Sequence, residues 1–312
     1  MRNPWARAAR WGASTASGVS VVASGRDVVG VAVAGDRVER AFVGHPGGDI
    51  IQISAIGDLI VVATSERMLV AYDDRGLRRW SAEFGDIVLS PVVGGVDSSI
   101  IAVALDGEVR RLDAANGAAI WSTPLGVDSA VAPAVADDRV IVGGRDGSIT
   151  SIAITNGEIQ WTSSMASPLE MAAAVDHLLV LTNDGTLVCL DAPTGDREWI
   201  RTTDGANALA VIAETAVVHS SLGLESFSLD GERGWRIQIP VEASIDQIAN
   251  IGDAVAMLTD STVTVVDPDG FAALKATLPP DFTASRTLMM PTIDGVLLVS
   301  GNGEFVLIGP PR

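Results

Sequence analysis

Three stretches of the chain repeat one phrase: DGEVRRLDAANGAAIW at residues 106–121, DGSITSIAITNGEIQW at 146–161 and DGTLVCLDAPTGDREW at 184–199. Each begins with Asp-Gly, runs through an apolar strand and a second glycine turn, and closes on tryptophan. A self-similar period of about 40 residues built from strands predicts stacked sheets, such as the blades of a β-propeller. Five tryptophans follow one another at intervals of 41, 40, 38 and 36 residues: Trp80, Trp121, Trp161, Trp199 and Trp235.

Each repeat is interpreted as four antiparallel strands. In the unit that closes on Trp121, we expect strands at 87–93, 100–104 and 108–112, and a last strand that ends at the tryptophan. Asp-Gly suits the tight reversals because glycine accepts a positive φ and aspartate tolerates it. Each unit buries its apolar face only against a neighbour, so the pattern predicts one continuous all-β structure.

Weaker copies of the phrase flank the clear ones and bring the expected number of blades to eight. Phe42 takes the tryptophan position 38 residues before Trp80, and an aliphatic stretch at 274–278 takes it near the other end. A large ring at this position can pack between adjacent blades while its N–H bonds a carbonyl there. We therefore assign the tryptophans a structural role.

The last unit stops without a fourth strand. A sheet with an unpaired edge is exposed to wrong pairing, and propellers close their ring by borrowing a strand from the opposite terminus. The segment 4–11 precedes the first unit and ends in Trp11, so we expect it to complete the last blade. Seven blades with irregular ends are the alternative. Either way, we predict a single closed β-propeller domain over residues 1–312.

Composition limits the classes of partner. The 39 acidic and 21 basic side chains give a net charge of −18, which repels phosphate backbones, so we expect no nucleic acid. No apolar run reaches 18 residues, so we expect no membrane insertion. The single cysteine, Cys189, excludes an intramolecular disulfide and a multi-cysteine metal site.

The same features bear on the compartment. One cysteine fits a reducing compartment, and we expect a cytoplasmic protein. The alternative is export, because residues 1–26 contain four arginines and no acid. No cysteine lies near the start, so a lipid anchor is not expected.

The Asp-Gly strand, the following Leu-Asp, the glycine turn and the tryptophan resemble the quinoprotein-type (PQQ-like) propeller repeat. The likeness covers nearly the whole chain and is strongest over residues 66–235. That family includes PQQ-dependent alcohol dehydrogenases and a non-enzymatic lipoprotein scaffold of outer-membrane barrel assembly. Many of the enzymes carry adjacent cysteines over the cofactor, whereas Cys189 stands alone, and the units here are near minimal. The resemblance therefore implies the non-enzymatic branch and no cofactor. Because the anchor of the scaffold lipoprotein is missing, we do not expect its envelope role to carry over.

We predict no catalytic, cofactor-binding or metal residue, and we assign no binding residue. The three histidines occupy non-equivalent positions in the repeat, and the loop 44–48 is expected to connect two blades. The acidic pairs are expected to be solvated turn charges, and one arginine of each pair is expected to face a neighbouring blade or the channel and the other water. These candidates are His45, His177, His219, Asp73-Asp74, Asp137-Asp138, Arg78-Arg79 and Arg110-Arg111.

A rigid repeat with loops on its faces and no catalytic motif predicts a non-catalytic scaffold, acting as a monomeric platform for a protein partner. The first alternative is a small-molecule or cofactor-dependent enzyme that uses the central funnel. The second is a sensor or structural module of a larger complex.

Overall fold

A computed structural model gives the fold. It describes residues 12–34, 37–203, 205–220, 223–238, 245–259, 262–279, 282, 287–292, 295–300 and 305–308. Within these ranges every regular element is a β-strand, in agreement with the predicted all-β class. The same ranges contain no helix with the length and apolar character needed to span a bilayer.

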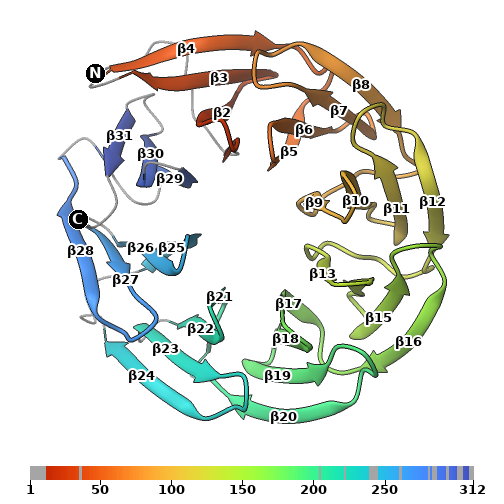
Figure 1. The fold of residues 1–312 in the computed structure, drawn as a ribbon, viewed down its shortest axis with the longest axis vertical. Helices are drawn as coiled ribbons and strands as arrows, with labels where there is room; N and C mark the ends of the chain where they lie inside the picture. The colour runs from red at the N-terminus through yellow and green to blue at the C-terminus, as the bar shows by residue number, and fades with distance from the viewer. Residues whose placement is uncertain are drawn as a thin grey trace. The chain divides into compact units, whose positions relative to one another are not determined.

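The described strands form eight antiparallel sheets, seven of four strands and one of three, each ordered as in the sequence (Figure 1). Two compact units divide them. The first unit covers Met1–Ala130 and Asp281–Pro310 and contains four sheets. Their strands are β1 Gly12–Ser14, β2 Val19–Ser24, β3 Asp27–Ala34, β4 Arg37–Gly44; β5 Ile50–Ile56, β6 Leu59–Thr64, β7 Met68–Tyr72, β8 Arg78–Glu83; β9 Val93–Gly94, β10 Ser99–Val103, β11 Glu108–Asp113, β12 Ala119–Pro124; and β29 Thr287–Thr292, β30 Gly295–Ser300, β31 Phe305–Ile308.

The second unit covers Val131–Pro280 together with Pro311–Arg312 and contains the other four sheets. Their strands are β13 Ala134–Ala136, β14 Arg139–Gly143, β15 Ser148–Ala153, β16 Ile159–Ser164; β17 Pro168–Ala174, β18 His177–Thr182, β19 Thr186–Asp191, β20 Arg197–Thr202; β21 Ala208–Ile212, β22 Thr215–Ser220, β23 Gly223–Ser228, β24 Arg233–Gln238; and β25 Ile245–Ile251, β26 Ala254–Thr259, β27 Thr262–Val266, β28 Ala272–Thr277. The single-domain expectation for 1–312 stays a prediction.

The predicted strands are confirmed in number but corrected at their ends. In the sheet β9–β12 the first strand is only Val93–Gly94, where an apolar run suggested 87–93. The fourth strand extends beyond Trp121, which is its third residue rather than its last. The ladder shifts register beside this tryptophan, with Arg111 opposite Trp121 and Leu112 opposite Ala119. The residue between them is therefore a β-bulge, which the periodic pattern does not reveal.

The structural role of the tryptophans is confirmed. The indole N–H of Trp80 donates to the carbonyl oxygen of Ala114, in the last turn of the next sheet, at 2.8 Å. In the second unit the indoles of Trp161, Trp199 and Trp235 donate in the same way to Ala192, Leu229 and Pro268 at 3.0, 2.6 and 2.7 Å. Each ring thus ties its own sheet to the following one.

A glycine of the neighbouring turn lies against each of these rings. At Gly195 the backbone has φ +78°, and an added Cβ would meet the ring of Trp161 at 2.6 Å. Two conditions require glycine at this position: the left-handed backbone conformation and the close contact with the ring. The same contact pairs Gly117 with Trp80, Gly231 with Trp199 and Gly270 with Trp235. The second glycine of each phrase is thus the partner of the tryptophan that closes the preceding repeat.

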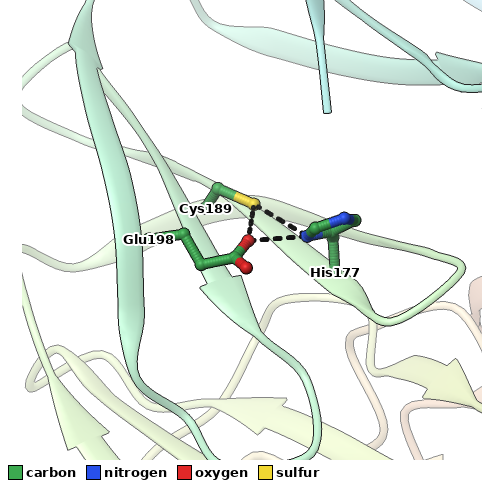
Figure 2. A group of neighbouring side chains, drawn as sticks. All are labelled: His177, Cys189 and Glu198. Atoms are coloured by element: carbon green, nitrogen blue, oxygen red, sulfur yellow. Dashed lines mark hydrogen bonds and ion pairs between the residues drawn. The ribbon is translucent and has the colours of Figure 1, made fainter. Parts of the chain in front are cut away.

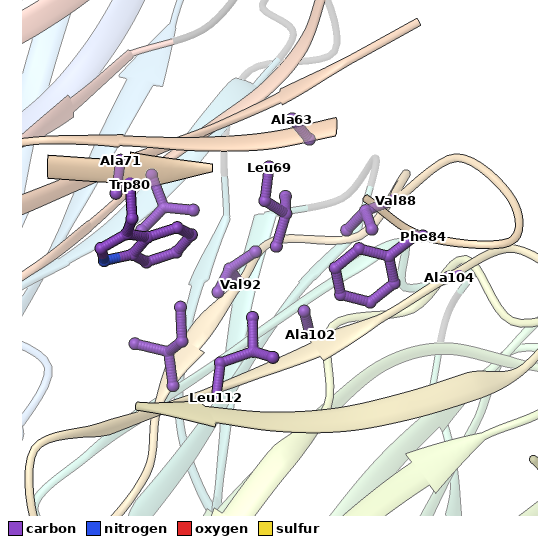
Figure 3. Packing of buried hydrophobic residues seen from close by; sticks show 12 residues of the cluster. Ala63, Leu69, Ala71, Trp80, Phe84, Val88, Val92, Ala102, Ala104 and Leu112 are labelled. Carbon is purple, nitrogen blue, oxygen red and sulfur yellow. The ribbon is translucent and has the colours of Figure 1, made fainter. Parts of the chain in front are cut away.

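The apolar core lies between adjacent sheets. Figure 3 shows one cluster in the first unit, where Leu69 and Trp80 of the sheet β5–β8 pack with Ala102 and Leu112 of the sheet β9–β12. These four side chains are buried, Trp80 retaining only 7% exposure. Apolar burial of this kind supplies the main favourable free energy of folding.

The first and last sheets of the chain pack together within the first unit. Val22 and Val29 of the first sheet share a buried cluster with Met290 and Leu297 of the sheet β29–β31. The last sheet has three described strands, as the sequence predicts. The segment 4–11, with Trp11, lies outside the described residues, so its pairing with the last sheet stays a prediction.

Candidate functional site

The sheet β17–β20 carries two features of functional interest on its opposite faces. Alternate residues of a strand point to opposite sides. In β19, Val188 and Leu190 pack toward the sheet β13–β16, whereas Leu187 and Cys189 pack toward the sheet β21–β24. The first face borders a pocket, and the second holds a cluster of metal-ligating side chains.

The pocket lies beside the end of β16 and has a volume of about 140 Å³. Its apolar lining includes Met165, Val188, Leu190 and Ile200, and Ile200 is 48% exposed. Drug-sized ligands and cofactors occupy pockets of about 300–1,000 Å³. This smaller pocket therefore suits a single side chain better than a cofactor.

Polar groups surround the apolar lining of the pocket. A carboxylate oxygen of Asp184 accepts hydrogen bonds from the Thr182 hydroxyl at 2.7 Å and from the Thr186 backbone N–H at 3.2 Å. The hydrogen bond from Thr182, followed by those from Thr186, lowers the pKa of Asp184, which therefore stays ionised at neutral pH. The exposed Arg197 supplies the opposite charge. The pocket thus combines an apolar lining with charges of both signs.

On the other face, His177, Cys189 and Glu198 come together from three consecutive strands, β18, β19 and β20 (Figure 2). A carboxylate oxygen of Glu198 lies 2.6 Å from Nδ1 of His177 and 3.4 Å from Sγ of Cys189. The sulfur lies 3.8 Å from the same imidazole nitrogen. The three donor atoms therefore form a compact triangle.

The strand register explains this juxtaposition. His177 pairs with Asp191 and Leu179 with Cys189, so His177 and Cys189 are diagonal neighbours. On the other side Cys189 pairs with Trp199, while Leu190 pairs with Arg197. Glu198 is therefore the extra residue of the β-bulge that precedes the tryptophan, and the bulge redirects its side chain toward the sulfur.

The environment of the cluster keeps the thiol protonated. Burial raises the pKa of Cys189, and the hydrogen bond and negative charge of Glu198 raise it further. Cys189 is fully buried, which agrees with its place in the middle of the apolar stretch TLVCLD at 186–191, and it is the free cysteine of the chain. The prediction missed its contacts, because the bulge that brings Glu198 to it leaves no mark in a two-residue periodicity.

The other two histidines lie apart from this cluster. In the loop that connects β4 to β5, as predicted for 44–48, Nδ1 of His45 lies 2.7 Å from a carboxylate oxygen of Asp27. His219 is buried in β22, and burial lowers its pKa. Its Nε2 has no hydrogen-bond partner among the described residues. The structure therefore does not bring the three histidines to one site.

The arginine pairs depart from the expected division into one inward-facing and one water-facing side chain. Arg78 and Arg79 are both exposed, because the register shift beside Trp80 makes Arg79 a bulge residue. In the other pair Arg111 is buried and donates to the Ser99 hydroxyl at 2.8 Å. Its neighbour Arg110 stacks on the ring of Phe84, 4.3 Å from the centroid, rather than facing water. The prediction of one inward and one outward arginine is wrong for both pairs.

The acidic pairs do belong to turns. The Asp73 carboxylate accepts hydrogen bonds from the backbone N–H groups of Arg75 and Leu77 at 3.1 and 2.8 Å. The exposed Asp138 forms an ion pair with Arg139 at 2.8 Å. These carboxylates thus stabilise turns and surface pairs, which accounts for part of the acidic composition.

Comparison with solved structures establishes the fold. The crystal structure of BamB from Moraxella catarrhalis matches with a TM-score of 0.72 at 19% identity, covering 98% of this chain and 96% of that one. The C-terminal WD40 domain of Sif2 matches with a TM-score of 0.80 at 12% identity, covering 98% and 97%. The eight sheets are the blades of an eight-bladed β-propeller, as expected from the repeat; the seven-bladed alternative is not supported.

Comparison with known sequences gives the family. A protein from Bordetella pertussis described as outer membrane protein assembly factor BamB is 26% identical over 283 residues, which span 81% of this chain and 70% of that protein. A protein of the same description from Yersinia pestis is 27% identical over 184 residues, or 52% of this chain and 46% of the relative. The chain thus covers about half of the second relative's length.

These relatives also bear on activity and location. They are described as assembly factors, in agreement with the prediction that the chain is not an enzyme. The expectation of a cytoplasmic protein is wrong, because the matching proteins are factors of outer membrane protein assembly. One cysteine is a weak guide to compartment, since a protein that makes no disulfide needs no oxidising environment and is not excluded from one. The family model for outer membrane protein assembly factor BamB matches residues 6–173 and 145–309, and the chain belongs to this family.

Proposed function

We propose that this chain is a non-catalytic propeller scaffold that binds a protein partner during the assembly of outer membrane proteins. The observation that carries the proposal is the match of the family model along both halves of the chain. The tryptophan contacts support it, because they hold neighbouring sheets of each unit in a fixed relation. A fixed framework of this kind presents loops and grooves to a partner without loss of conformational entropy on binding.

The pocket beside β16 and β20 is the surface that we assign to the partner. Its exposed Ile200 and buried Val188 suit one apolar side chain of an extended segment. The hydroxyl of Ser163 and the charges of Asp184 and Arg197 are placed to bond the polar groups on either side of that side chain. An apolar centre with a polar rim is the usual anatomy of a protein interface.

Site-specific photo-crosslinking tests the proposal. A photoreactive residue at position 200 is expected to capture one component of the outer membrane assembly machinery in the intact envelope. The matched control is position 236, because Arg236 is the fourth residue of β24 as Ile200 is of β20. Equal capture at both positions would contradict the assignment of the pocket as the partner-binding surface.

A functional readout accompanies the crosslink. The Ile200→Asp variant is expected to lower the amount of folded outer membrane protein in the envelope several-fold, since a carboxylate in an apolar contact is left desolvated. The Arg236→Gln variant should retain the normal amount, because Arg233 still pairs with the Glu225 carboxylate at 3.2 Å. If neither variant changes that amount and no position captures an assembly component, the proposed function itself fails.

A further inference from the structure

We propose that His177, Cys189 and Glu198 form a binding site for Zn²⁺, with a water molecule as fourth ligand. Each of these side chains offers one metal-ligating atom. Among the described residues, these three atoms all lie within 4.8 Å of one another. The proposal is independent of the scaffold function, because the cluster faces the sheet β21–β24 and the pocket faces the sheet β13–β16. It departs from the sequence-based expectation of no metal site.

The donor set selects the metal. The site offers one sulfur, one imidazole nitrogen and one carboxylate oxygen. Thiolate and imidazole ligands favour zinc and similar transition metals, whereas magnesium and calcium prefer oxygen. Three protein ligands with an open fourth position is a known zinc arrangement.

The distances fit four-coordinate zinc with one adjustment. Zinc bonds of about 2.0–2.3 Å place tetrahedral ligand atoms about 3.5 Å apart. The sulfur lies 3.4 Å from the Glu198 oxygen and 3.8 Å from the His177 nitrogen, close to that value. The imidazole and carboxylate are 2.6 Å apart, so their hydrogen bond must open as the ion enters.

A metal ion can reach the site from solvent through the two partly exposed ligands. The side chain of His177 is 24% exposed and that of Glu198 is 34% exposed, whereas Cys189 is buried. An ion can therefore reach the imidazole and carboxylate from solvent and then bind the sulfur beneath them. Binding displaces the thiol proton, and the charge of the ion stabilises the thiolate that burial alone disfavours.

The fold itself does not demand these three residues. The equivalent positions of the sheet β9–β12 are Ser99, Arg111 and Ile120, and there one hydrogen bond of 2.8 Å joins the serine to the arginine. The sheet β13–β16 has Arg139, Ser151 and Gln160 at these positions. Neither of these sheets places a metal-ligating set at the three positions, so the ligand set is a property of β17–β20 alone among the three.

Cobalt absorption tests the proposal on the untagged full chain. Co²⁺ is expected to bind one ion per chain with a sulfur-to-cobalt charge-transfer band and the visible bands of tetrahedral coordination, and Zn²⁺ should displace it. Cys189 is the one cysteine of the sequence, so the charge-transfer band can arise there only. Cys189→Ser should abolish the band, and His177→Gln should weaken cobalt binding at least tenfold.

The matched control is His45→Gln. The His45–Asp27 pair has an imidazole and a carboxylate oxygen 2.7 Å apart but no thiol, so its loss should leave the cobalt spectrum unchanged. Far-ultraviolet circular dichroism without metal checks that each variant is folded. A wild-type protein that shows no charge-transfer band at millimolar Co²⁺, or a band that survives Cys189→Ser, would overturn the proposal.

Discussion

The sheets β9–β12 and β17–β20 share one backbone plan and differ in the chemistry placed on it. Both have four antiparallel strands and a bulge before a tryptophan of the last strand. At the same three positions one sheet has Ser99, Arg111 and Ile120, and the other has a histidine, a cysteine and a glutamate. The comparison teaches that the repeat fixes positions, while the residues at those positions vary without altering the sheet.

What the sheets share is expected to matter most for stability. Replacing Trp161 by alanine should lower the free energy of unfolding by about 3–5 kcal/mol, because it empties the contact between neighbouring sheets. The hydrogen bond from its indole to Ala192 is lost as well. Urea unfolding followed by circular dichroism measures the change.

Trp161→Phe is the control for that measurement. It keeps most of the ring but removes the indole N–H, so it should cost about 1–2 kcal/mol, mainly the lost hydrogen bond. Equal losses for phenylalanine and alanine would show that the ring contact itself contributes little.

A pair of glycines separates backbone strain from the ring contact. Gly195 and Gly185 both have φ +78°, but an added Cβ would meet Trp161 at 2.6 Å in the first case and a backbone atom no closer than 3.6 Å in the second. Gly185→Ala should cost about 1–2 kcal/mol for the left-handed conformation. Gly195→Ala should cost about 1–3 kcal/mol more from overpacking.

The same unfolding experiment compares the two glycine variants. Because their φ angles are equal, the difference between their midpoints reports the contact with the tryptophan. If both variants lose the same stability, the ring would be shown to move aside without cost, and the second glycine of the repeat would need only its backbone conformation.

The smallest expected effect on stability concerns Glu170 of β17, which takes the place of a glutamine in the equivalent strands of two other sheets. Glu170 follows a register shift in β17, where Gln52 and Gln247 stand in β5 and β25. Its carboxylate accepts a hydrogen bond from the backbone N–H of Leu209. Burial raises the pKa of Glu170 despite this bond.

The raised pKa predicts a pH dependence with a definite sign. The unfolded chain loses this proton at a lower pH than the folded chain does, so stability falls as the pH rises from the unfolded pKa to the folded pKa. Glu170→Gln should remove that decline and leave stability above this range unchanged or slightly higher. The check is urea midpoints from pH 4 to 8, and a variant with the wild-type pH profile would contradict it.

The repeated phrase was sufficient to predict the sheets and their main contacts. Alternating apolar residues between glycine turns predict hairpins, and the spacing of the tryptophans predicts their recurrence. The packing of Trp161 against a neighbouring sheet, with its N–H bonded to a carbonyl there, followed from the need to bury a large ring and satisfy its N–H. These inferences depend on local pattern, which a single sequence records.

The candidate site depended on what the pattern does not record. Glu198 comes to Cys189 through a one-residue bulge, which breaks the alternation that places side chains on faces. The arginine pairs were assigned wrongly because a bulge at Arg79 breaks the alternation in one pair and the ring of Phe84 covers Arg110 in the other. A β-bulge adds one residue to a strand and so changes the face of its side chain, which a two-residue period does not record.

By itself the sequence determined that this chain is an all-β repeat of about 40 residues whose tryptophans pack between neighbouring units, because periodicity and turn chemistry are local. Only the tertiary structure decided that His177, Cys189 and Glu198 meet and that a pocket opens beside Ile200. The first depends on the register between the strands of one sheet, and the second on the contact between two sheets. The residues lie close together in the chain, but the β-bulge that brings Glu198 to Cys189 and the packing that opens the pocket beside Ile200 follow no local periodicity.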